Sequence, residues 1–439
     1  MTFIDQAMKS VDQAEVYSIH RKVAQVRFRE DTLSLVANRD ATACALRVIA
    51  DGRLGASFGE SVQTGLLEDA AAAAAYGQEA SFSFAPDQEY PSVQGADPMS
   101  DRLSASDLID LAVDVRERIR RASPDAVVNL LCEAESGERS IETTEGAAAT
   151  EAFARTTLGV EVPFPSRGTD VGATARLVLT GPVEIPDAWI DDLLEQRSWG
   201  TGASVPASGR LPVLLTPYTS HLLTLTLAAC LGSESVAKGA SPLGEKLGEQ
   251  ILSDRLTIRE DPTHAGFPFA RVFDDEGVAV QSRAIIEQGV LRSFLIDLQG
   301  ASDLGGPPTG NAARRTMFSE KIEDAPAPGW LGAIIEPGKD SWRDLLAGID
   351  EGLLVTRLSG LHSSNLLQGQ YAVKADGYHI RGGKPVGYLE RTMIAGNVFE
   401  DFRNVRAVSS ERRLTAQAEM EVPGLAPYIL LESAQVTVG

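Results

Sequence analysis

Three carboxylates stand next to one another in the segment Phe273-Asp274-Asp275-Glu276-Gly277. Neighbouring carboxylates raise one another's pKa and can serve as an acid and a base, or they can hold a cation. Successive side chains of a strand point to opposite faces, so the three acids converge only if the backbone turns. Asp, Glu and Gly also form turns, which makes a solvated turn the alternative interpretation.

A second polar segment, Thr309-Gly310-Asn311-Ala312-Ala313-Arg314-Arg315, follows the glycine- and proline-rich residues 305–308. Its two guanidinium groups can clamp a substrate carboxylate, because arginine donates two parallel hydrogen bonds to such a group. Alternatively, they neutralise acidic side chains of this chain, such as Asp274, Asp275 or Glu276. The residue pattern leaves both interpretations open.

The five histidines show no helix-borne pattern of a zinc protease. A zinc site on a helix requires a second ligand about one turn after the first, and a carboxylate to activate water. His221 is followed by Leu222 and has Thr224 three residues on, so we expect it to cap or pack the start of a helix. His362 lies in the polar residues 360–365 and can contact a ligand from a loop.

Sequence signatures of other chemistries are weak. The serine pairs at 363–364 and 409–410 lack a G-x-S-x-G context, and no glycine-rich nucleotide-binding loop is present. A Ser-His-Asp triad assembled in space stays open. Cys44, Cys132 and Cys230 are far apart and form no C-x-x-C pair, so neither a disulfide framework nor a cysteine zinc site is indicated, and a reducing compartment fits best.

The composition is that of a globular protein with a sizeable core. The chain has 439 residues, enough for about two to four structural units, and is 43% apolar and 23% charged. Its 40 basic and 61 acidic side chains give a net charge of −21, which repels phosphate backbones, so no nucleic-acid partner is predicted. Prolines and polar residues interrupt the most apolar window, residues 211–232, so no membrane span is predicted either.

The N-terminal residues have neither a basic start nor an apolar run of signal-peptide length, so we expect a cytoplasmic protein. Apolar residues at helical spacing predict a helix over residues 108–119, with Ser104 and Asp107 placed for a capping box. Further helices are predicted at residues 61–75, 187–198 and 219–230.

Strands are predicted between these helices. They include residues 23–28 and 41–50 before an Asp51-Gly52 turn, hairpins over residues 127–179 broken at Ser136-Gly137 and Arg167-Gly168, and a hairpin of residues 278–287 and 290–296 around Gln288-Gly289. Because strand clusters are segregated from helices, we predict an α+β fold of mostly antiparallel sheets with packed helices. With residues 81–100 as a linker, the expected domains are residues 1–100, 101–210 and 211–439.

Four segments together resemble the TldD/PmbA family, whose members are regarded as peptidase components. These segments are residues 45–55, residues 273–297, the loop 309–315, and residues 352–387 followed by 393–397. The resemblance implies an α+β fold with an N-terminal, a middle and a larger C-terminal domain, and a dimer that encloses a chamber.

The TldD-like branch of this family carries HExxxH on the helix that corresponds to residues 219–230 and a cysteine later in the chain. This sequence has no such histidine pair and no cysteine after Cys230. It therefore resembles the TldE/PmbA-like branch, which implies a chain without its own metal, paired with a TldD-like subunit that carries zinc.

The resemblance implies a non-catalytic subunit of a heterodimeric zinc metalloprotease that cleaves unfolded peptides or modified-peptide precursors. Main-chain hydrogen bonds from strand edges can hold an extended peptide in the chamber. We expect Asp274, Asp275, Asn311 and Arg315 to face this chamber and bind substrate together with His362. Two alternatives stay open: a stand-alone hydrolase that uses the carboxylates of residues 274–276, and a gyrase-modulating binding protein.

Overall fold

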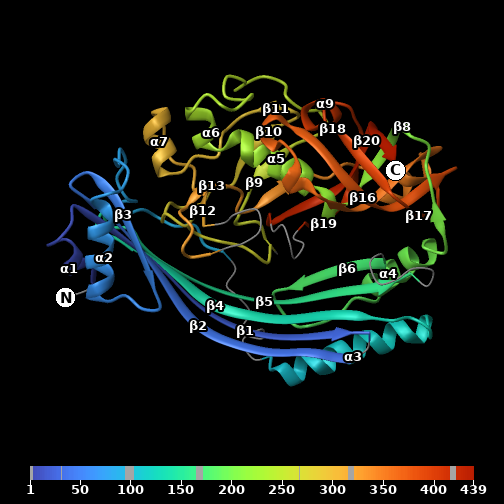
Figure 1. Cartoon of the computed structure of the whole chain (residues 1–439), viewed down its shortest axis with the longest axis horizontal. Coiled ribbons are helices and arrows are strands. Elements are labelled where there is room, and N and C mark those ends of the chain that lie inside the picture. Colours follow the sequence, from blue (N-terminus) through green and yellow to red (C-terminus); the bar gives the residue numbers. More distant parts are fainter. Residues whose placement is uncertain are drawn as a thin grey trace.

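A computed structural model of the chain describes residues 3–30, 32–93, 103–164, 172–265, 267–314, 321–415 and 422–439. A long, curved sheet runs along one side of the molecule, and a larger C-terminal unit lies over its concave face (Figure 1). The described helices are all too short or too polar to cross a membrane. Most strand pairs are antiparallel, so the predicted α+β fold is confirmed.

The curved sheet has six strands in the order β3-β2-β1-β4-β5-β6, and all neighbours are antiparallel. Segments on both sides of the predicted boundary at residue 100 contribute to it. The elements of this half are α1 (Phe3–Ala7), β1 (Gln13–Arg29), β2 (Thr32–Ala50), β3 (Arg53–Gly59), α2 (Thr64–Ala74), α3 (Ala105–Ala122), β4 (Asn129–Thr143), β5 (Ala148–Pro163), β6 (Gly172–Leu179) and α4 (Asp187–Trp199).

Three predicted helices of this half are confirmed as α2, α3 and α4. At the start of α3, the Ser104 hydroxyl accepts a hydrogen bond from the Asp107 N–H, and the Asp107 carboxylate accepts one from the Ser104 N–H. This is the predicted capping box. Buried Leu108, Val115 and Ile119 of α3 pack against the convex face of the sheet.

One predicted turn is wrong. Ser136-Gly137 lies within the continuous strand β4, and the chain turns instead after Thr143, at residues 144–147. Gly137 is required for another reason: a Cβ atom there would lie 2.1 Å from the His20 carbonyl oxygen and 2.8 Å from the Phe153 ring. The Asp51-Gly52 turn is confirmed, since both residues have positive φ. The predicted break at Arg167-Gly168 lies outside the described residues.

The C-terminal unit is built on a twelve-stranded sheet with the main order β11-β10-β9-β14-β20-β8-β15-β16-β17-β7, to which β18 and β19 add. Its strands are β7 (Ala203–Ser204), β8 (Gly209–Leu215), β9 (Ile258–Glu260), β10 (Arg283–Glu287), β11 (Val290–Leu291), β14 (Ala333–Ile335), β15 (Glu351–Ser359), β16 (Gln370–Arg381), β17 (Lys384–Leu389), β18 (Thr392–Asn397), β19 (Val405–Leu414) and β20 (Gly424–Val438). The pair β12 (Ala312–Ala313) and β13 (Ala327–Pro328) stands apart.

The helices of this unit are α5 (His221–Leu231), α6 (Ser233–Ala237), α7 (Leu298–Leu304), α8 (Trp342–Ala347) and α9 (Val398–Asp401). Helix α5 is the predicted helix of residues 219–230, and its leucines belong to the main core of the unit. The predicted hairpin at Gln288-Gly289 is confirmed with positive φ at both residues, but its strands are only β10 and β11, shorter than predicted.

We predict that replacing the capping residue of α3, Ser104→Ala, destabilises the protein by about 1 kcal/mol, because the Asp107 N–H loses its acceptor. Urea unfolding of the full chain measures the effect. The matched control is Ser106→Ala at an exposed position in the same helix, where alanine is expected to be neutral or slightly stabilising. Equal midpoints for the two variants would contradict a stabilising cap.

Candidate functional site

The acidic segment forms a tight turn, as one of the two interpretations predicted, but the turn is buried. The Asp274 N–H donates to the Val278 carbonyl at 2.9 Å, and Gly277 adopts a φ of +79°. Asp274, Asp275 and Glu276 are each at most 3% exposed. The solvated surroundings that accompanied this interpretation are therefore wrong, because the turn lies where the concave face of the curved sheet meets the C-terminal unit.

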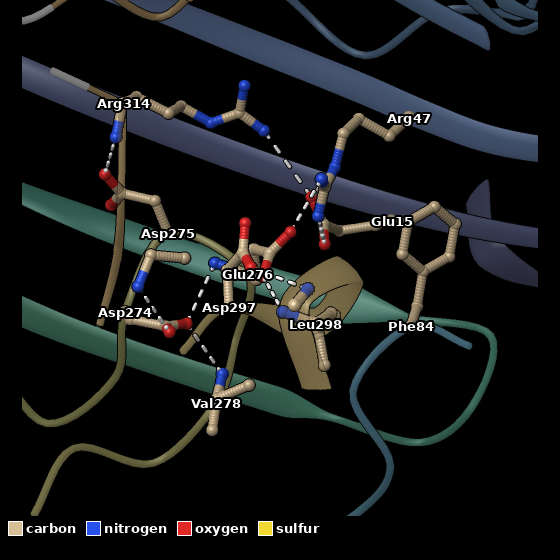
Figure 2. Close-up of polar contacts among 12 residues, drawn as sticks. Glu15, Arg47, Phe84, Asp274, Asp275, Glu276, Val278, Asp297, Leu298 and Arg314 are labelled. Carbon is tan, nitrogen blue, oxygen red and sulfur yellow. Dashed lines mark hydrogen bonds and ion pairs between the residues drawn. The ribbon is translucent and has the colours of Figure 1, made fainter. Parts of the chain in front are cut away.

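The three carboxylates point to different partners (Figure 2). Asp274 accepts hydrogen bonds from the N–H groups of Glu276, Val278 and Ala312, each at 2.9 Å. These hydrogen bonds hold the turn closed and connect it to β12. Because all three of these donors belong to the main chain, the carboxylate fixes the path of the backbone.

Asp275 is bonded to the side chain of one arginine and to the main chain of another. One of its oxygens accepts from the Arg271 guanidinium, and the other accepts from the Arg314 N–H at 2.6 Å. The Arg271 side chain also lies 3.5 Å from the Glu151 carboxylate of β5. Burial opposes the charge of Asp275, but its ion pair with Arg271 prevails and holds the pKa of this carboxyl well below its usual range.

Glu276 crosses to the curved sheet, where it meets Arg47 of β2 (Figure 2). The Arg47 guanidinium donates to Glu276 at 2.9 Å and to both oxygens of Glu15 at 2.8 and 2.6 Å. Glu15 and Arg47 are direct neighbours across β1 and β2. The second Glu276 oxygen accepts from the Leu298 N–H at the start of α7. One buried arginine is thus shared by two carboxylates from two halves of the molecule.

Burial shifts the protonation of this cluster. It raises the pKa of Glu276 to about 7, with the charge of Asp297 acting in the same direction and Arg47 opposing it. Burial and the nearby Glu276 also raise the pKa of Asp274 well above its usual range. Arg47 keeps its charge despite burial, since Glu15 and Glu276 raise its pKa. The cluster therefore tends to retain a proton near neutral pH.

The other predicted site residues lie in different surroundings. Asn311 is fully buried beside this turn, where its side chain accepts from the Thr309 hydroxyl at 2.8 Å and donates to the Gly329 carbonyl. Arg315 lies outside the described residues. His362 is exposed on a single 3-10 turn, Leu361–Ser363, and is not part of the buried cluster. The structure thus brings together Asp274, Asp275 and Asn311.

The sequence reasoning missed Glu15, Arg47, Arg271 and Glu151, which complete the cluster. Nothing in their local sequence distinguishes them from ordinary strand or loop charges. Their function follows only from the register of β1 and β2 and from the position of the C-terminal unit. As an assembly, the cluster connects the two halves of the molecule, and its buried oxygens are already bonded to groups of this chain.

The start of α5 does not fit a zinc ion. His221 Nδ1 lies 2.8 Å from the Tyr218 carbonyl oxygen, and its buried Nε2 has no partner among the described residues. Burial lowers the pKa of His221 to about 4, so the imidazole is neutral. The next positions that zinc would require carry Leu222 and Thr226, and the Thr226 hydroxyl donates to the Leu222 carbonyl. A single imidazole without a carboxylate does not make a zinc site.

Within the described ranges, no group of three or more His, Cys, Asp or Glu side chains is placed to hold a metal ion. A G-x-S-x-G pattern occurs at Gly55–Gly59, but it lies in strand β3. The Ser57 hydroxyl of this pattern donates to the Leu66 carbonyl at 2.7 Å. It therefore lacks the strand-turn-helix context of a nucleophile.

We predict that Arg47→Met destabilises the protein by about 3 to 5 kcal/mol at pH 8, because Glu15 and Glu276 would remain buried without their cation. The loss should shrink as the pH falls toward 5. Carboxyls with a raised folded-state pKa favour folding when protonated, and this contribution is lost as pH rises through the folded-state pKa. Urea unfolding at several pH values measures both effects.

The control is Arg292→Met, which removes an exposed ion pair with Glu287. Such a pair contributes at most about 1 kcal/mol, and its loss should not vary between pH 5 and 8. A cost for Arg47→Met that is equally small, or that is independent of pH, would contradict the account of the cluster.

Comparison with known proteins gives the context of this geometry. Residues 208–438, more than half of the chain, match the family described as the PmbA/TldA metallopeptidase C-terminal domain. The chain is 31% identical over 216 residues to a metalloprotease of Methanothermobacter thermautotrophicus, covering 48% of this chain and 45% of that protein. It is 27% identical to a metalloprotease PmbA homolog of Buchnera aphidicola, covering 51% and 48%. The chain thus spans about half the length of the curated relatives it matches.

The fold itself is shared over nearly the whole length with a solved structure. TldE from Thermococcus kodakarensis superposes with a TM-score of 0.90 at 24% sequence identity, covering 99% of both chains. The similarity therefore extends to the curved sheet, which lies outside the matched residues 208–438. From the match over residues 208–438 and these relatives together, the chain belongs to the TldD/PmbA family.

Proposed function

We propose that this chain is the metal-free, non-catalytic subunit of a heterodimeric zinc metalloprotease that cleaves unfolded peptides or modified-peptide precursors. In this complex, a TldD-like partner subunit would carry the zinc ion. The observation that carries the proposal is the donor set of α5, which offers one neutral histidine, His221, where a zinc site needs several ligands. Relatives of the chain are named metalloproteases, so the chemistry is expected on another subunit.

The edge of the curved sheet supports a partner subunit. Strand β3 pairs only with residues 44–50 of β2, so residues 32–43 of β2 pair on one side alone in the described structure. Most of these residues are exposed, including Leu33 and Val36 at 43% and 46%. Long exposed edges with apolar side chains pair readily with strands of another chain. We assign this edge to contact with the partner subunit.

The predicted substrate-binding residues take two roles within this proposal. Asp274, Asp275 and Asn311 act as positioning residues, because their side chains are buried and bonded to this chain. His362 is exposed and is the described candidate that can touch a peptide. The buried, free thiols of Cys44, Cys132 and Cys230 fit a reducing compartment, so we place the complex in the cytoplasm.

The burial of the acidic turn argues against a stand-alone hydrolase. A catalytic carboxylate must come within hydrogen-bond distance of the substrate, whereas Asp274, Asp275 and Glu276 are covered and have partners within this chain. A role on DNA or gyrase has the net charge of −21 against it. Neither alternative gains support from a specific contact.

We predict that the isolated chain shows no chelator-sensitive peptidase activity and retains no stoichiometric zinc, whereas its complex with a TldD-like subunit shows both. His221→Gln should leave the activity and the zinc content of the complex within about twofold of the wild type, because this imidazole does not hold the metal. Peptide hydrolysis assays and elemental analysis of both preparations measure these quantities. Peptidase activity of the isolated chain that resists chelator would overturn the proposal.

We predict that Leu33→Lys combined with Val36→Lys weakens association with the TldD-like subunit on the order of tenfold or more, because lysine on an exposed edge opposes strand pairing. Sedimentation velocity of mixtures measures the affinity. Val386→Lys on β17, where the valine is 47% exposed, adds the same charge at another site and should leave association unchanged. If the double variant associates with unaltered affinity, the β2 edge is not the surface that contacts the partner subunit.

A further inference from the structure

A pocket of about 610 Å³ lies between the concave face of the curved sheet and the C-terminal unit, away from the acidic turn. Its floor is a row of residues that are direct neighbours across β1, β4, β5 and β6: Arg27, Leu131, Gly159 and Arg176. Neighbours in such a row point to the same face of a sheet. The residues of this row therefore lie on the same face of the sheet, with an arginine at each end of the row.

Gly159 makes the space between these arginines. It has no side chain, so the row exposes bare backbone next to Arg176, and Leu131 lies between Gly159 and Arg27. A Cβ atom at this position would have the Leu131 Cβ as its nearest neighbour at 3.9 Å, which is an ordinary contact. The backbone thus tolerates a side chain here, and the absence of one leaves the floor open.

The roof of the pocket belongs to the C-terminal unit. Tyr218 precedes helix α5, which begins at His221, and Arg357 lies on β15. The Arg357 guanidinium pairs with one oxygen of Asp376 at 2.9 Å, and the Lys374 ammonium shares the other oxygen of this carboxylate at 2.9 Å. The pocket therefore lies next to the helix on which a TldD-like chain would carry its metal ligands.

The charge of the lining favours a single negative group. The charged residues of the lining are Arg27, Arg29, Arg176 and Arg357 against Glu30 and Glu161. Arginines thus outnumber carboxylates in this lining, in a chain whose net charge is −21. Such a local reversal of sign attracts an anion, and arginine forks match the two oxygens of a carboxylate. A multiply charged phosphate fits less well because two glutamates face the same space.

We propose that this pocket binds a peptide carboxylate, with Arg27 and Arg176 as its ligands on either side of Gly159. Pockets of about 300 to 1,000 Å³ hold small organic ligands, so this one has room for the end of a peptide. The inference rests on the proposed function, in which the substrate is an extended peptide. The carboxylate comes either from the C-terminus of the peptide or from an Asp or Glu side chain.

The test measures binding to the isolated full chain by fluorescence anisotropy, so it does not depend on a partner or on activity. The probes are an N-terminally fluorescein-labelled tetra-alanine with a free carboxylate, its C-terminal amide, and an amide with one internal glutamate. We expect the free acid to bind at least about tenfold tighter than the plain amide, because a charge-assisted hydrogen bond is lost in the amide. Tight binding of the glutamate probe would show that the pocket also accepts a side-chain carboxylate.

The double variant Arg27→Gln with Arg176→Gln should abolish this preference, and Gly159→Phe should abolish binding of every probe by filling the floor. Arg292→Gln, which removes the same type of charge from an exposed site, should bind as the wild type does. Circular dichroism and thermal unfolding verify that each variant is folded. Equal binding of acid and amide, an unchanged preference in the double variant, or no binding of the free acid overturns the proposal, whether or not the zinc subunit is found.

Discussion

The sharing of one buried guanidinium between two carboxylates fixes the arrangement of the molecule. Arg47 and Glu15 belong to the curved sheet, whereas Glu276 belongs to the C-terminal unit, and all three side chains are buried. A buried charge without its counterion is costly, so the two halves cannot separate at this point without a large penalty. The concave face of the sheet is thereby held at a set distance from the C-terminal unit, and the arginine-lined pocket depends on that distance.

This constraint explains why the acidic segment 274–276 stabilises the fold, although its adjacent carboxylates resemble a catalytic group. Asp274 binds three main-chain N–H groups, and Asp275 and Glu276 are paired with arginines, so none of the three offers a free oxygen to a substrate. Under the proposed function, chemistry on a peptide would then come from another subunit. Helix α5, with His221 alone, does not offer a metal site, so in the proposed complex the partner subunit would supply both the metal and its general base.

Sequence patterns were informative where the physics is local. The capping box of Ser104 and Asp107 and the positive-φ turn at Gln288-Gly289 depend on neighbouring residues, and both were predicted correctly. Failures arose where distant contacts decide. The Ser136-Gly137 pair predicts a turn, yet Gly137 is needed because two other strands approach it closely. The FDDEG turn was predicted, but its burial was not, since the covering sheet lies more than a hundred residues away in sequence and its register cannot be read from the turn itself.

Under the proposed function, the divalent ion of the complex lies on the partner subunit. Anomalous diffraction at the zinc absorption edge, from crystals of the complex of this chain with a TldD-like subunit, tests it most directly. We expect one strong peak per heterodimer, located on the partner subunit, and none beside His221. A fully occupied peak coordinated by side chains of this chain would contradict the account.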